Sequence, residues 1–406
     1  MSMKKQIGVI FGSRSCEREV SIISAIQLMK YADPEKYDII PVYIDEHGNW
    51  YTGDLLRDIR TFNPFNPDAK GILKVYPDLA AGSGALLHHE KGTGLLAREK
   101  TEIAARIDAY IVVMHGMNGE DGTLQGLFEL ANIPYSSTGV MGSAVGMDKI
   151  TMKLFFQGAG LPVLPGIWAT RKEFAEDPDG IVKRVKEGPG FPVFVKPANL
   201  GSSIGVSRAD DEESLKDSLS LAFEYDRRVL IEKGLDKPIE LNCSVLGYDD
   251  ELRASPIEMP LNHDEFLDFR DKYLGNTGSK GMASLSRVLP APIEDDLKCR
   301  IQELSKQIFR LLDCKGVVRT DYMYDRVSGE LYITEINTIP GSMAFYLWEK
   351  DGLPYSDLID RLVEYAEKAH ADKNINNYAY TSDILKSAVI GGKGAKGSKG
   401  SKAVKA

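Results

Sequence analysis

The chain has few cysteines, and they lie far apart. Cys16, Cys243, Cys299 and Cys314 form no C-x-x-C pair and no spacing typical of a zinc site. A small secreted domain built on disulfides is therefore excluded, and a reducing compartment is expected. No run approaches the roughly 20 apolar residues that cross a bilayer, and the apolar run before Gly12 is too short for a signal peptide. We expect a cytoplasmic protein without a transmembrane segment.

An excess of positive charge is also missing. Acidic residues outnumber basic ones by 59 to 50, and the net charge is −9. Five of the lysines lie in residues 391–406, so the rest of the chain is more acidic still. This balance argues against nucleic acid as a partner. The lysine- and glycine-rich tail has too little apolar surface to fold by itself. We expect it to be flexible and solvated, with contact to an anionic surface as the alternative.

The chain is 43% apolar and 27% charged, which is typical of a globular protein. Its length of 406 residues predicts two to four domains. The opening predicts a strand over Ile7–Phe11, a helix with apolar residues at 22, 23, 26 and 29, and a strand over Tyr37–Ile44. This is a β-α-β unit. The loop at residues 12–17 lacks the glycine spacing that admits a dinucleotide pyrophosphate, which excludes a dehydrogenase.

Further along, residues 50–105 have an irregular pattern and are predicted to be an inserted, partly loop segment. A buried strand over Tyr110–Met114 leads into the glycine-rich loop 115–126, and one helix is predicted from about Ser143 to Gln157, ending at Gly158. Later strands are expected at Phe191–Lys196, Val229–Glu232, Glu240–Leu246, Val317–Asp325 and Leu331–Asn337, and a helix closes the folded part near residue 371.

The last two strands form a predicted hairpin that brings polar residues together. If Arg326 pairs with Glu330 across the turn, then Asp321 faces Glu335 and Arg319 faces Asn337, all on one face. Opposed carboxylates repel unless one is protonated or a cation lies between them, and this ligand set suits Mg²⁺. A solvated face on which Arg319 pairs with Asp321 is an equally good interpretation of the pattern.

A second candidate site is the loop Gly201–Gly205, which follows the strand that carries Lys196. Its glycines and the hydroxyls of Ser202 and Ser203 let backbone N–H groups approach phosphate oxygens, although the pattern is not a Walker A sequence. A surface turn is as good an interpretation. Other candidate contacts are Lys149 on a helix, Glu232 and Lys233 at a strand end, Glu240, and His115 at the end of a strand, where ligands bind in open α/β sheets. Lys149 and the glutamates also have a simpler interpretation as surface charge, whereas His115 is a better candidate than the other five histidines.

Several separated blocks, taken together, resemble the D-alanine–D-alanine ligases of the ATP-grasp superfamily over roughly residues 5–365. The matching blocks are FGSRSCEREVS (11–21), HGMNGEDGTLQG (115–126), GMDK (146–149), FPVFVKPANLGSSIG (191–205), DFRDKY (268–273), RTD (319–321) and EINTIPG (335–341). The resemblance implies an α/β fold of three domains: an N-terminal parallel-sheet domain (1–137) and two ATP-grasp α+β subdomains (138–231 and 232–371). The flexible tail follows at 372–406. It also implies ATP and Mg²⁺ (or Mn²⁺) as cofactors, and a homodimer.

The resemblance further implies a role for individual residues. Asp321, Glu335 and Asn337 are the expected metal ligands. The expected nucleotide contacts are Lys149, Lys196, Ser203, Glu232, Lys233, Glu240 and Lys272. Glu17 is expected to hold the ammonium of the first substrate and to form a hydrogen-bonded trio with Ser202 and Tyr273. Arg319 and the Gly341 N–H are the expected oxyanion hole, and His115 is expected near the first substrate.

The second substrate is less well defined by this resemblance. A tyrosine at position 273, where D-Ala–D-lactate ligases have histidine, favours an amine as the attacking group. After Gly341 the family has a Thr/Ser-rich stretch, whereas this chain is about four residues shorter and reads SMAFYLW (342–348). Ser342 is the candidate replacement donor. The main hypothesis is a D-alanine–D-alanine ligase that supplies peptidoglycan precursors. The alternatives are a ligase with another second substrate, such as D-serine, and a nucleotide-binding regulator without ligase activity.

Overall fold

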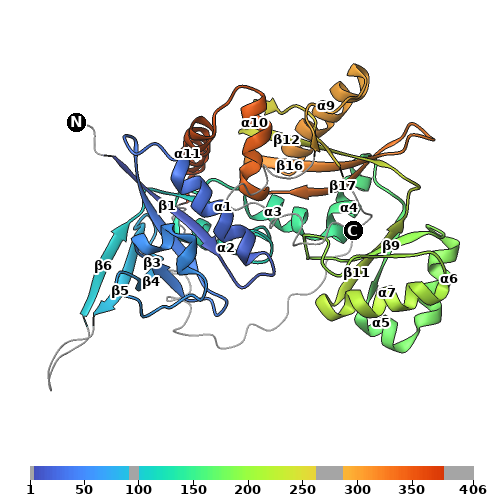
Figure 1. Cartoon of the computed structure of the whole chain (residues 1–406), viewed down its shortest axis with the longest axis horizontal. Helices are drawn as coiled ribbons and strands as arrows, with labels where there is room; N and C mark the ends of the chain where they lie inside the picture. Colours follow the sequence, from blue (N-terminus) through green and yellow to red (C-terminus); the bar gives the residue numbers. More distant parts are fainter. Residues whose placement is uncertain (1–3, 91–99, 262–286, 379–406) are drawn as a thin grey trace, which may run out of the picture. The chain divides into compact units, whose positions relative to one another are not determined.

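The computed structural model describes residues 4–90, 100–261 and 287–378. The chain divides into two compact units, 1–370 and 371–406, and the second is described over 371–378, where the end of the last helix leads into a turn. Within the first unit, buried apolar side chains form three large cores. Each core is built on a different β-sheet (Figure 1).

The N-terminal sheet has seven strands in the order β6-β5-β4-β3-β2-β1-β7. The first strand, β1 (Lys5–Gly12), is parallel to both β2 (Tyr37–Ile44) and β7 (Ala109–Val112). Helix α1 (Arg18–Tyr31) connects β1 to β2 and buries Leu28 and Met29 in the first core. The predicted β-α-β unit is therefore confirmed, and the carboxyl ends of β1 and β7 meet at one edge of the sheet.

The segment 50–105 is more regular than predicted. It contains β3 (Trp50–Thr52), β4 (Leu73–Pro77), β5 (Ala85–Glu90) and β6 (Lys100–Arg106), which extend the sheet through antiparallel pairs. Loop residues lie between these strands, as expected of a partly loop segment, but the strands themselves were not predicted. Two short 3-10 helices, η1 (Asp54–Arg57) and η2 (Ile59–Thr61), lie between β3 and β4. Phe62 and Phe65 each place their ring centroid 4.9 Å from that of Tyr43, so aromatic packing ties this segment to β2.

The single helix predicted over 143–157 is two helices. After α2 (Thr123–Ala131), the chain forms α3 (Val140–Met147) and α4 (Lys149–Gly158). Asp148 has extended backbone angles and its carboxylate accepts from the Thr151 N–H, so it caps the start of α4. The predicted end at Gly158 is confirmed.

The central sheet has the order β10-β9-β11-β8, with β8 (Gly166–Thr170), β9 (Val193–Pro197), β10 (Ser207–Ala209) and β11 (Arg228–Lys233). Helices α5 (Arg171–Glu176), α6 (Pro178–Glu187) and α7 (Glu212–Tyr225) lie on one side of it (Figure 1). Val195 and Ile231 point into the core beneath these helices. Because side chains alternate along a strand, Lys196, Leu230 and Glu232 project from the other face.

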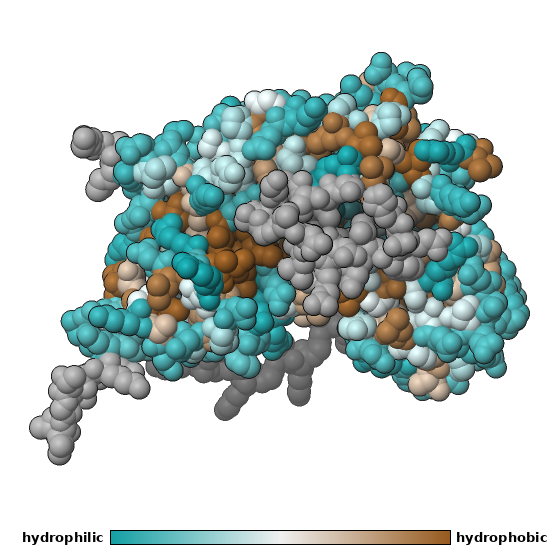
Figure 2. All heavy atoms as spheres, in the orientation of Figure 1, coloured by the Kyte–Doolittle hydropathy of each residue, from teal (hydrophilic) through white to brown (hydrophobic). Residues whose placement is uncertain are grey.

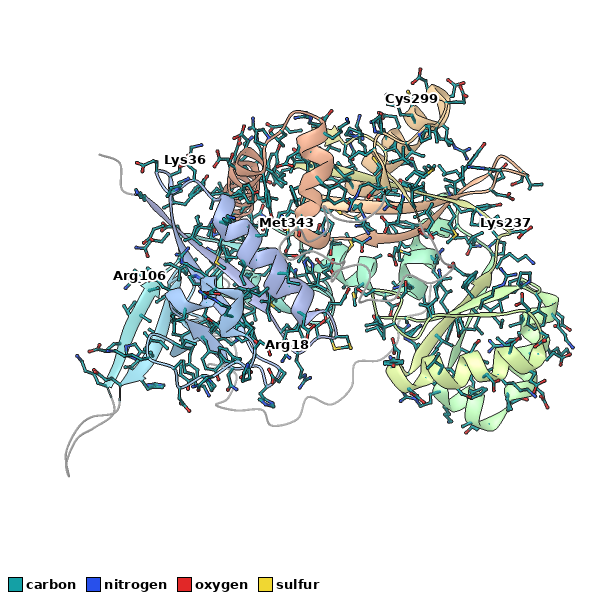
Figure 3. The ribbon with its side chains drawn as sticks, viewed as in Figure 1. Arg18, Lys36, Arg106, Lys237, Cys299 and Met343 are labelled. Carbon is teal, nitrogen blue, oxygen red and sulfur yellow. The ribbon has the colours of Figure 1, made fainter. Side chains whose placement is uncertain are left out.

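The third sheet has the order β13-β12-β16-β17, with β12 (Ile239–Tyr248), β13 (Glu251–Ala254), β16 (Lys315–Tyr324) and β17 (Leu331–Asn337). Helix α9 (Asp295–Leu311) packs against it, and β14 (Met259–Pro260) pairs with β15 (Arg287–Val288) nearby. A short turn, η4 (Gly341–Ala344), then leads into α10 (Phe345–Lys350) and α11 (Tyr355–Lys373). The buried residues of α10 and α11 belong to the N-terminal core, and Met343 lies beside α1 (Figure 3).

The visible surface is largely hydrophilic, with hydrophobic residues in separate patches (Figure 2). All four cysteines are free thiols: Cys16 and Cys299 are exposed, whereas Cys243 and Cys314 are buried. In the part of the chain that the structure describes, no helix has both the length and the apolar character needed to cross a membrane.

Candidate active site

The hairpin of β16 and β17 has the predicted pairing at its polar end. Arg319 faces Asn337, and Asp321 faces Glu335. At the turn the prediction is wrong, because Asp325 rather than Arg326 faces Glu330, with the Asp325 N–H donating to the Glu330 carbonyl at 2.9 Å. A β-bulge after Asp321 accounts for the one-residue shift, and the Thr334 hydroxyl donates to the Asp321 carbonyl at 2.8 Å there.

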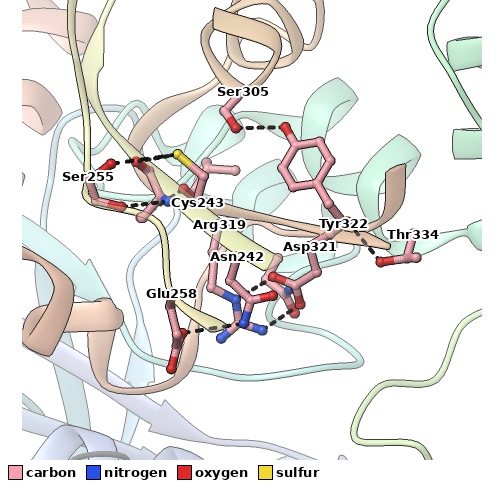
Figure 4. Close-up of polar contacts among 12 residues, drawn as sticks. Asn242, Cys243, Ser255, Glu258, Ser305, Arg319, Asp321, Tyr322 and Thr334 are labelled. Carbon is pink, nitrogen blue, oxygen red and sulfur yellow. Dashed lines mark hydrogen bonds and ion pairs between the residues drawn. The ribbon is translucent and has the colours of Figure 1, made fainter. Parts of the chain in front are cut away.

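The Arg319–Asp321 pair of the second interpretation is present, but it is largely buried rather than solvated. The Arg319 guanidinium donates twice to Asp321, from Nε at 2.6 Å and from Nη2 at 2.7 Å, and Asn337 Nδ2 donates to the same carboxylate at 3.0 Å (Figure 4). Burial, together with the opposed Glu335, raises the pKa of Asp321 to about 6, against the lowering effect of Arg319. A cation bound between Asp321 and Glu335 would therefore relieve the repulsion between their carboxylates.

This pair is a suitable site for Mg²⁺. In the described residues no group of three or more His, Cys, Asp or Glu side chains could hold a metal ion. The hairpin instead offers two carboxylates, Asp321 and Glu335, together with the Asn337 amide. That set matches an ion that binds one or two carboxylates and completes its shell with water and phosphate oxygens.

Lys149 joins the hairpin to the loop after β9. Its ammonium donates to the Leu200 carbonyl at 2.7 Å and lies 3.8 Å from a Glu335 carboxylate oxygen. Its backbone N–H donates to the Ala198 carbonyl at 2.9 Å. With 9% of its surface exposed, Lys149 is not the exposed helix lysine of the simpler interpretation.

A second cluster lies on the open face of the central sheet, around the carboxylate of Glu232. Lys196 pairs with one of its oxygens, and the ammonium of Lys153 lies 2.7 Å from the other. Burial alone would raise the pKa of Glu232, but the two ammonium groups bring it down to about 2. Glu240 is also within electrostatic range of Lys196. Lys233 points to the opposite face, where its ammonium donates to the Phe191 carbonyl at 2.9 Å.

Sequence analysis missed Lys153. Its ammonium also donates to the Ile333 carbonyl of β17 at 3.0 Å, so it links α4 to both sheets of the site. A signal was present, because Lys153 lies three residues from Ile150 and from Phe156 on the apolar stripe of α4. A charged residue at such a position needs a buried partner.

The loop Gly201–Gly205, called the glycine-rich loop from here on, lies against Glu17, which directly precedes α1. The Ser202 hydroxyl donates to the Glu17 carboxylate. A Cβ on Gly116 would lie 2.4 Å from a Glu17 carboxylate oxygen, and one on Gly201 would lie 2.9 Å from both oxygens. Two glycines from distant segments therefore make room for this carboxylate, which is 8% exposed. Ser202 and Ser203 both have positive φ, at 55° and 58°. Lys272 and Tyr273 lie outside the described residues.

His115 is buried in a hydrogen-bond network. Its Nδ1 lies 2.8 Å from the Ile339 carbonyl, so Nδ1 carries the proton and Nε2 accepts from the Ser24 hydroxyl at 3.1 Å. Burial lowers the pKa of His115 to about 4. The Ser342 N–H donates to Ser24 at 3.1 Å, and the Ser342 hydroxyl donates to Gln27 at 2.9 Å. The hydroxyl of Ser342 is thus directed to α1.

Glu120 is a further residue that sequence analysis missed. One of its carboxylate oxygens accepts from the Gly116 N–H at 2.9 Å and the other from the Ile339 N–H at 2.8 Å. Burial and the nearby Glu17 carboxylate raise the pKa of Glu120 to about 8. Glu120 therefore fastens the loop that carries His115 to the loop that leads to Gly341. Its place in the block 115–126 was the available signal.

Taken together, the fold and the site define a class of protein. A lysine-bearing strand and glycine-rich loop face a hairpin with opposed carboxylates, and a separate N-terminal sheet contributes Glu17 and His115. This is the arrangement of a three-domain ATP-grasp ligase, an α/β enzyme of mixed sheets.

Two family models, described as the N-terminus and the C-terminus of D-Ala D-Ala ligase, match residues 6–138 and 155–364. The chain belongs to the D-alanine–D-alanine ligase family. It is 38% identical over 385 residues to the D-alanine–D-alanine ligase of Acetivibrio thermocellus, covering 93% of this chain and all of that protein. It is 36% identical over 377 residues to that of Bacillus velezensis, covering 91% of this chain and all of that one.

Solved structures agree with this assignment. The D-alanine-D-alanine ligase from Coxiella burnetii superposes with a TM-score of 0.74 at 26% identity, covering 97% of this chain and all of that one. The VanG D-Ala:D-Ser ligase from Enterococcus faecalis also gives 0.74, at 31% identity, covering 90% of this chain and all of that one. The fold is thus shared by ligases named for different second substrates.

Proposed function

We propose that this protein is an ATP- and Mg²⁺-dependent ligase that joins two molecules of D-alanine and so supplies a peptidoglycan precursor. The observation that carries this proposal is the position of Lys149. Its ammonium contacts both the carbonyl of Leu200 beside the glycine-rich loop and the carboxylate of Glu335 on the hairpin. A phosphate chain between these elements would meet a cation, backbone N–H groups and a metal-binding carboxylate pair.

The described residues divide naturally between the steps of the reaction. Lys149, Lys196 and Ser203 would hold the phosphates of ATP, with Glu232, Glu240 and the backbone of Lys233 at the adenosine. Asp321, Glu335 and Asn337 would hold Mg²⁺, which neutralises charge on the phosphate oxygens when it is bound. Lys272 and Tyr273 lie outside the described residues and keep their proposed roles. Lys272 would contact the phosphates of ATP, and Tyr273 would lie beside Glu17.

In the first step, the carboxylate of one D-alanine attacks the γ-phosphorus of ATP, giving D-alanyl phosphate and ADP. Glu17 would pair with the ammonium of this D-alanine, and neutral His115 would lie beside it. In the second step, the amine of the acceptor attacks the acyl carbon, phosphate leaves and the amine loses a proton. Arg319 and the Gly341 N–H would stabilise the oxyanion formed between attack and departure.

A ligase with another acceptor, such as D-serine, is the second candidate. Two observations favour it over a strict preference for D-alanine: the hydroxyl of Ser342 is engaged with Gln27, and the VanG D-Ala:D-Ser ligase is among the similar structures. Both candidates share the first step, so they differ only in the amine that is captured.

We further propose the domain limits 1–137, 138–231 and 232–371, with 372–406 as an appended tail, a homodimer as the working form, and a cytoplasmic location. The three cores support a three-domain division. Limited proteolysis and sedimentation analysis test the domain limits and the dimer.

Product identification by mass spectrometry tests the function. The protein is supplied with ATP, Mg²⁺ and D-alanine, alone and then with D-serine, glycine, D-lactate or L-amino acids. A D-Ala–D-Ala product from D-alanine alone is the expected result. A mixed product without that dipeptide would favour the second candidate, and ATP turnover that D-alanine does not stimulate would contradict both.

A further inference from the structure

Next to Arg319 lies a buried charged cluster that the two reaction steps above leave unused. Glu258, 3% exposed, has one carboxylate oxygen 2.9 Å from Arg287 Nη1, and its other oxygen accepts from the Tyr346 hydroxyl at 2.9 Å. The guanidinium carbon of Arg287 lies 3.8 Å from the centre of the Tyr346 ring. The side-chain amide of Asn242 lies between this carboxylate and that of Asp321. Arg287 is therefore held by an ion pair and by a ring.

The cluster is continuous with the metal-binding hairpin. Glu258 and Tyr346 are among the groups that act electrostatically on Arg319, and Glu258 lies on the side of Arg319 away from Asp321 (Figure 4). Two carboxylates and two guanidinium groups thus follow one another, as Asp321, Arg319, Glu258 and Arg287. Burying four charges costs desolvation free energy, and apolar residues of similar size are often as stable. We therefore expect the arrangement to have a use.

The chemistry of the acceptor supplies such a use. An amino acid whose amine attacks beside Arg319 carries its own carboxylate two bonds away from that amine. This carboxylate needs a cation or a hydrogen-bond donor close to Arg319, because a buried carboxylate needs a charged or hydrogen-bonded partner. Ser342 is a poor receiver, because it is 1% exposed and bonded to Ser24 and Gln27.

We propose that Arg287 binds the carboxylate of the acceptor amino acid, and that Tyr346 and Glu258 hold its guanidinium in position. Arg287 is a specificity-determining residue in this scheme, and Tyr346 is a positioning residue. Tyr346 belongs to α10, directly after the turn at residues 342–344, whose three φ angles are all positive. The shortened segment after Gly341 thus provides the ring on which Arg287 stacks. This inference rests on the proposed ligase function.

Two measurements on Arg287→Met separate the inference from that function. Hydroxylamine traps D-alanyl phosphate as a hydroxamate and reports the first step without an acceptor. In competition between D-alanine and D-alaninamide, the ratio of free-acid to amide dipeptide, read by mass spectrometry, reports recognition of the acceptor carboxylate.

We expect Arg287→Met to keep hydroxamate formation, to raise the KM for the acceptor about 10- to 100-fold, as for loss of a charged hydrogen bond, and to shift products toward the amide. Arg287→Lys should shift the ratio less, and Tyr346→Leu more than Tyr346→Phe, which keeps the ring. Arg253→Met is the matched control, because Arg253 pairs at the surface with Asp351.

An unchanged product ratio and acceptor KM in Arg287→Met would overturn the inference. Equal loss of both steps in Arg287→Met and Arg287→Lys would also overturn it, because the role would then be structural. Absence of hydroxamate with the unaltered protein would instead contradict the ligase function itself.

Discussion

At the scale of single residues, the site consists of charges whose partners lie on other segments. Glu232 is 1% exposed yet ionised, because Lys153 and Lys196 reach it from α4 and β9. Asp321 differs, because its partner Arg319 lies on the same strand and burial keeps the pKa of Asp321 raised, at about 6. Residue type and spacing predicted most of these groups, since their chemistry is visible in the sequence. The Arg319–Asp321 and Glu17–Ser202 contacts were expected, but the two lysine partners of Glu232 were not, because they depend on how separate elements meet.

The proposed metal-binding pair, Asp321 and Glu335, gives the first prediction. Glu335→Gln should lower Mg²⁺-dependent turnover by at least about 100-fold, comparable with removal of a group that stabilises the transition state, while the chain remains folded. Turnover against Mg²⁺ concentration and urea unfolding are the measurements. Glu330→Gln, at the exposed turn of the same hairpin, is the control. Full activity in Glu335→Gln would contradict the metal assignment.

His115 gives a prediction about pH. Its folded pKa of about 4 lies below the ordinary value of 6.5, so the unfolded chain binds a proton first as the pH falls. Its contribution to the free energy of unfolding is therefore lost between pH 6.5 and pH 4, by up to about 3 kcal/mol.

His115→Asn should unfold with a weaker dependence on pH in that window than the unaltered chain, as measured by urea titration at several pH values. The comparison is necessary because the pKa of Glu120 in the folded chain is raised to about 8. Its contribution to the free energy of unfolding therefore grows as the pH falls, opposite to that of His115. Identical pH profiles would show that His115 does not titrate in this way.

At the scale of helices and strands, the sequence predicted the positions of elements better than their interruptions. The β1, β2, β7, β16 and β17 strands were recognised from apolar runs. The bulge in β17 was not, although the apolar spacing changes from two (Leu331 to Ile333) to three (Ile333 to Ile336) where it lies. The break between α3 and α4 was also missed, although Asp148 is a typical capping residue.

Helix α4 carries the third prediction. Lys153→Met should lower the free energy of unfolding by about 2 kcal/mol or more, because Glu232 keeps only one of its two buried partners. Adding Glu232→Gln should restore part of that loss, since the uncompensated charge is then removed. Lys183→Met, which breaks an exposed pair with Glu187 on α6, should cost under about 0.5 kcal/mol. Urea denaturation measures all three, and equal effects at Lys153 and Lys183 would refute the argument.

At the scale of the whole molecule, the three cores follow from the alternation of β and α segments in the sequence. The strands within 50–105 did not follow from it, because β6 has no buried residue and neither β5 nor β6 has an apolar alternation. Their register is set by pairing with neighbouring strands. Such tertiary contacts leave little trace in a local pattern.

The tail gives the prediction at this scale. Deleting residues 391–406 should leave ligation unchanged, because the family matches end at residue 364 and no proposed site residue lies beyond Tyr346. Steady-state rates of the full and shortened chains are the measurement. A large loss of rate on deletion would assign the lysines a part in catalysis.

Glu120 has a consequence for how two loops that are distant in the sequence can move. The two oxygens of Glu120 are each committed to a different loop, one beside Glu17 and His115 and the other leading to Gly341. These loops therefore share one anchor. A displacement of one loop therefore strains the hydrogen bond that Glu120 makes to the other, so the two loops are mechanically coupled through a single carboxylate.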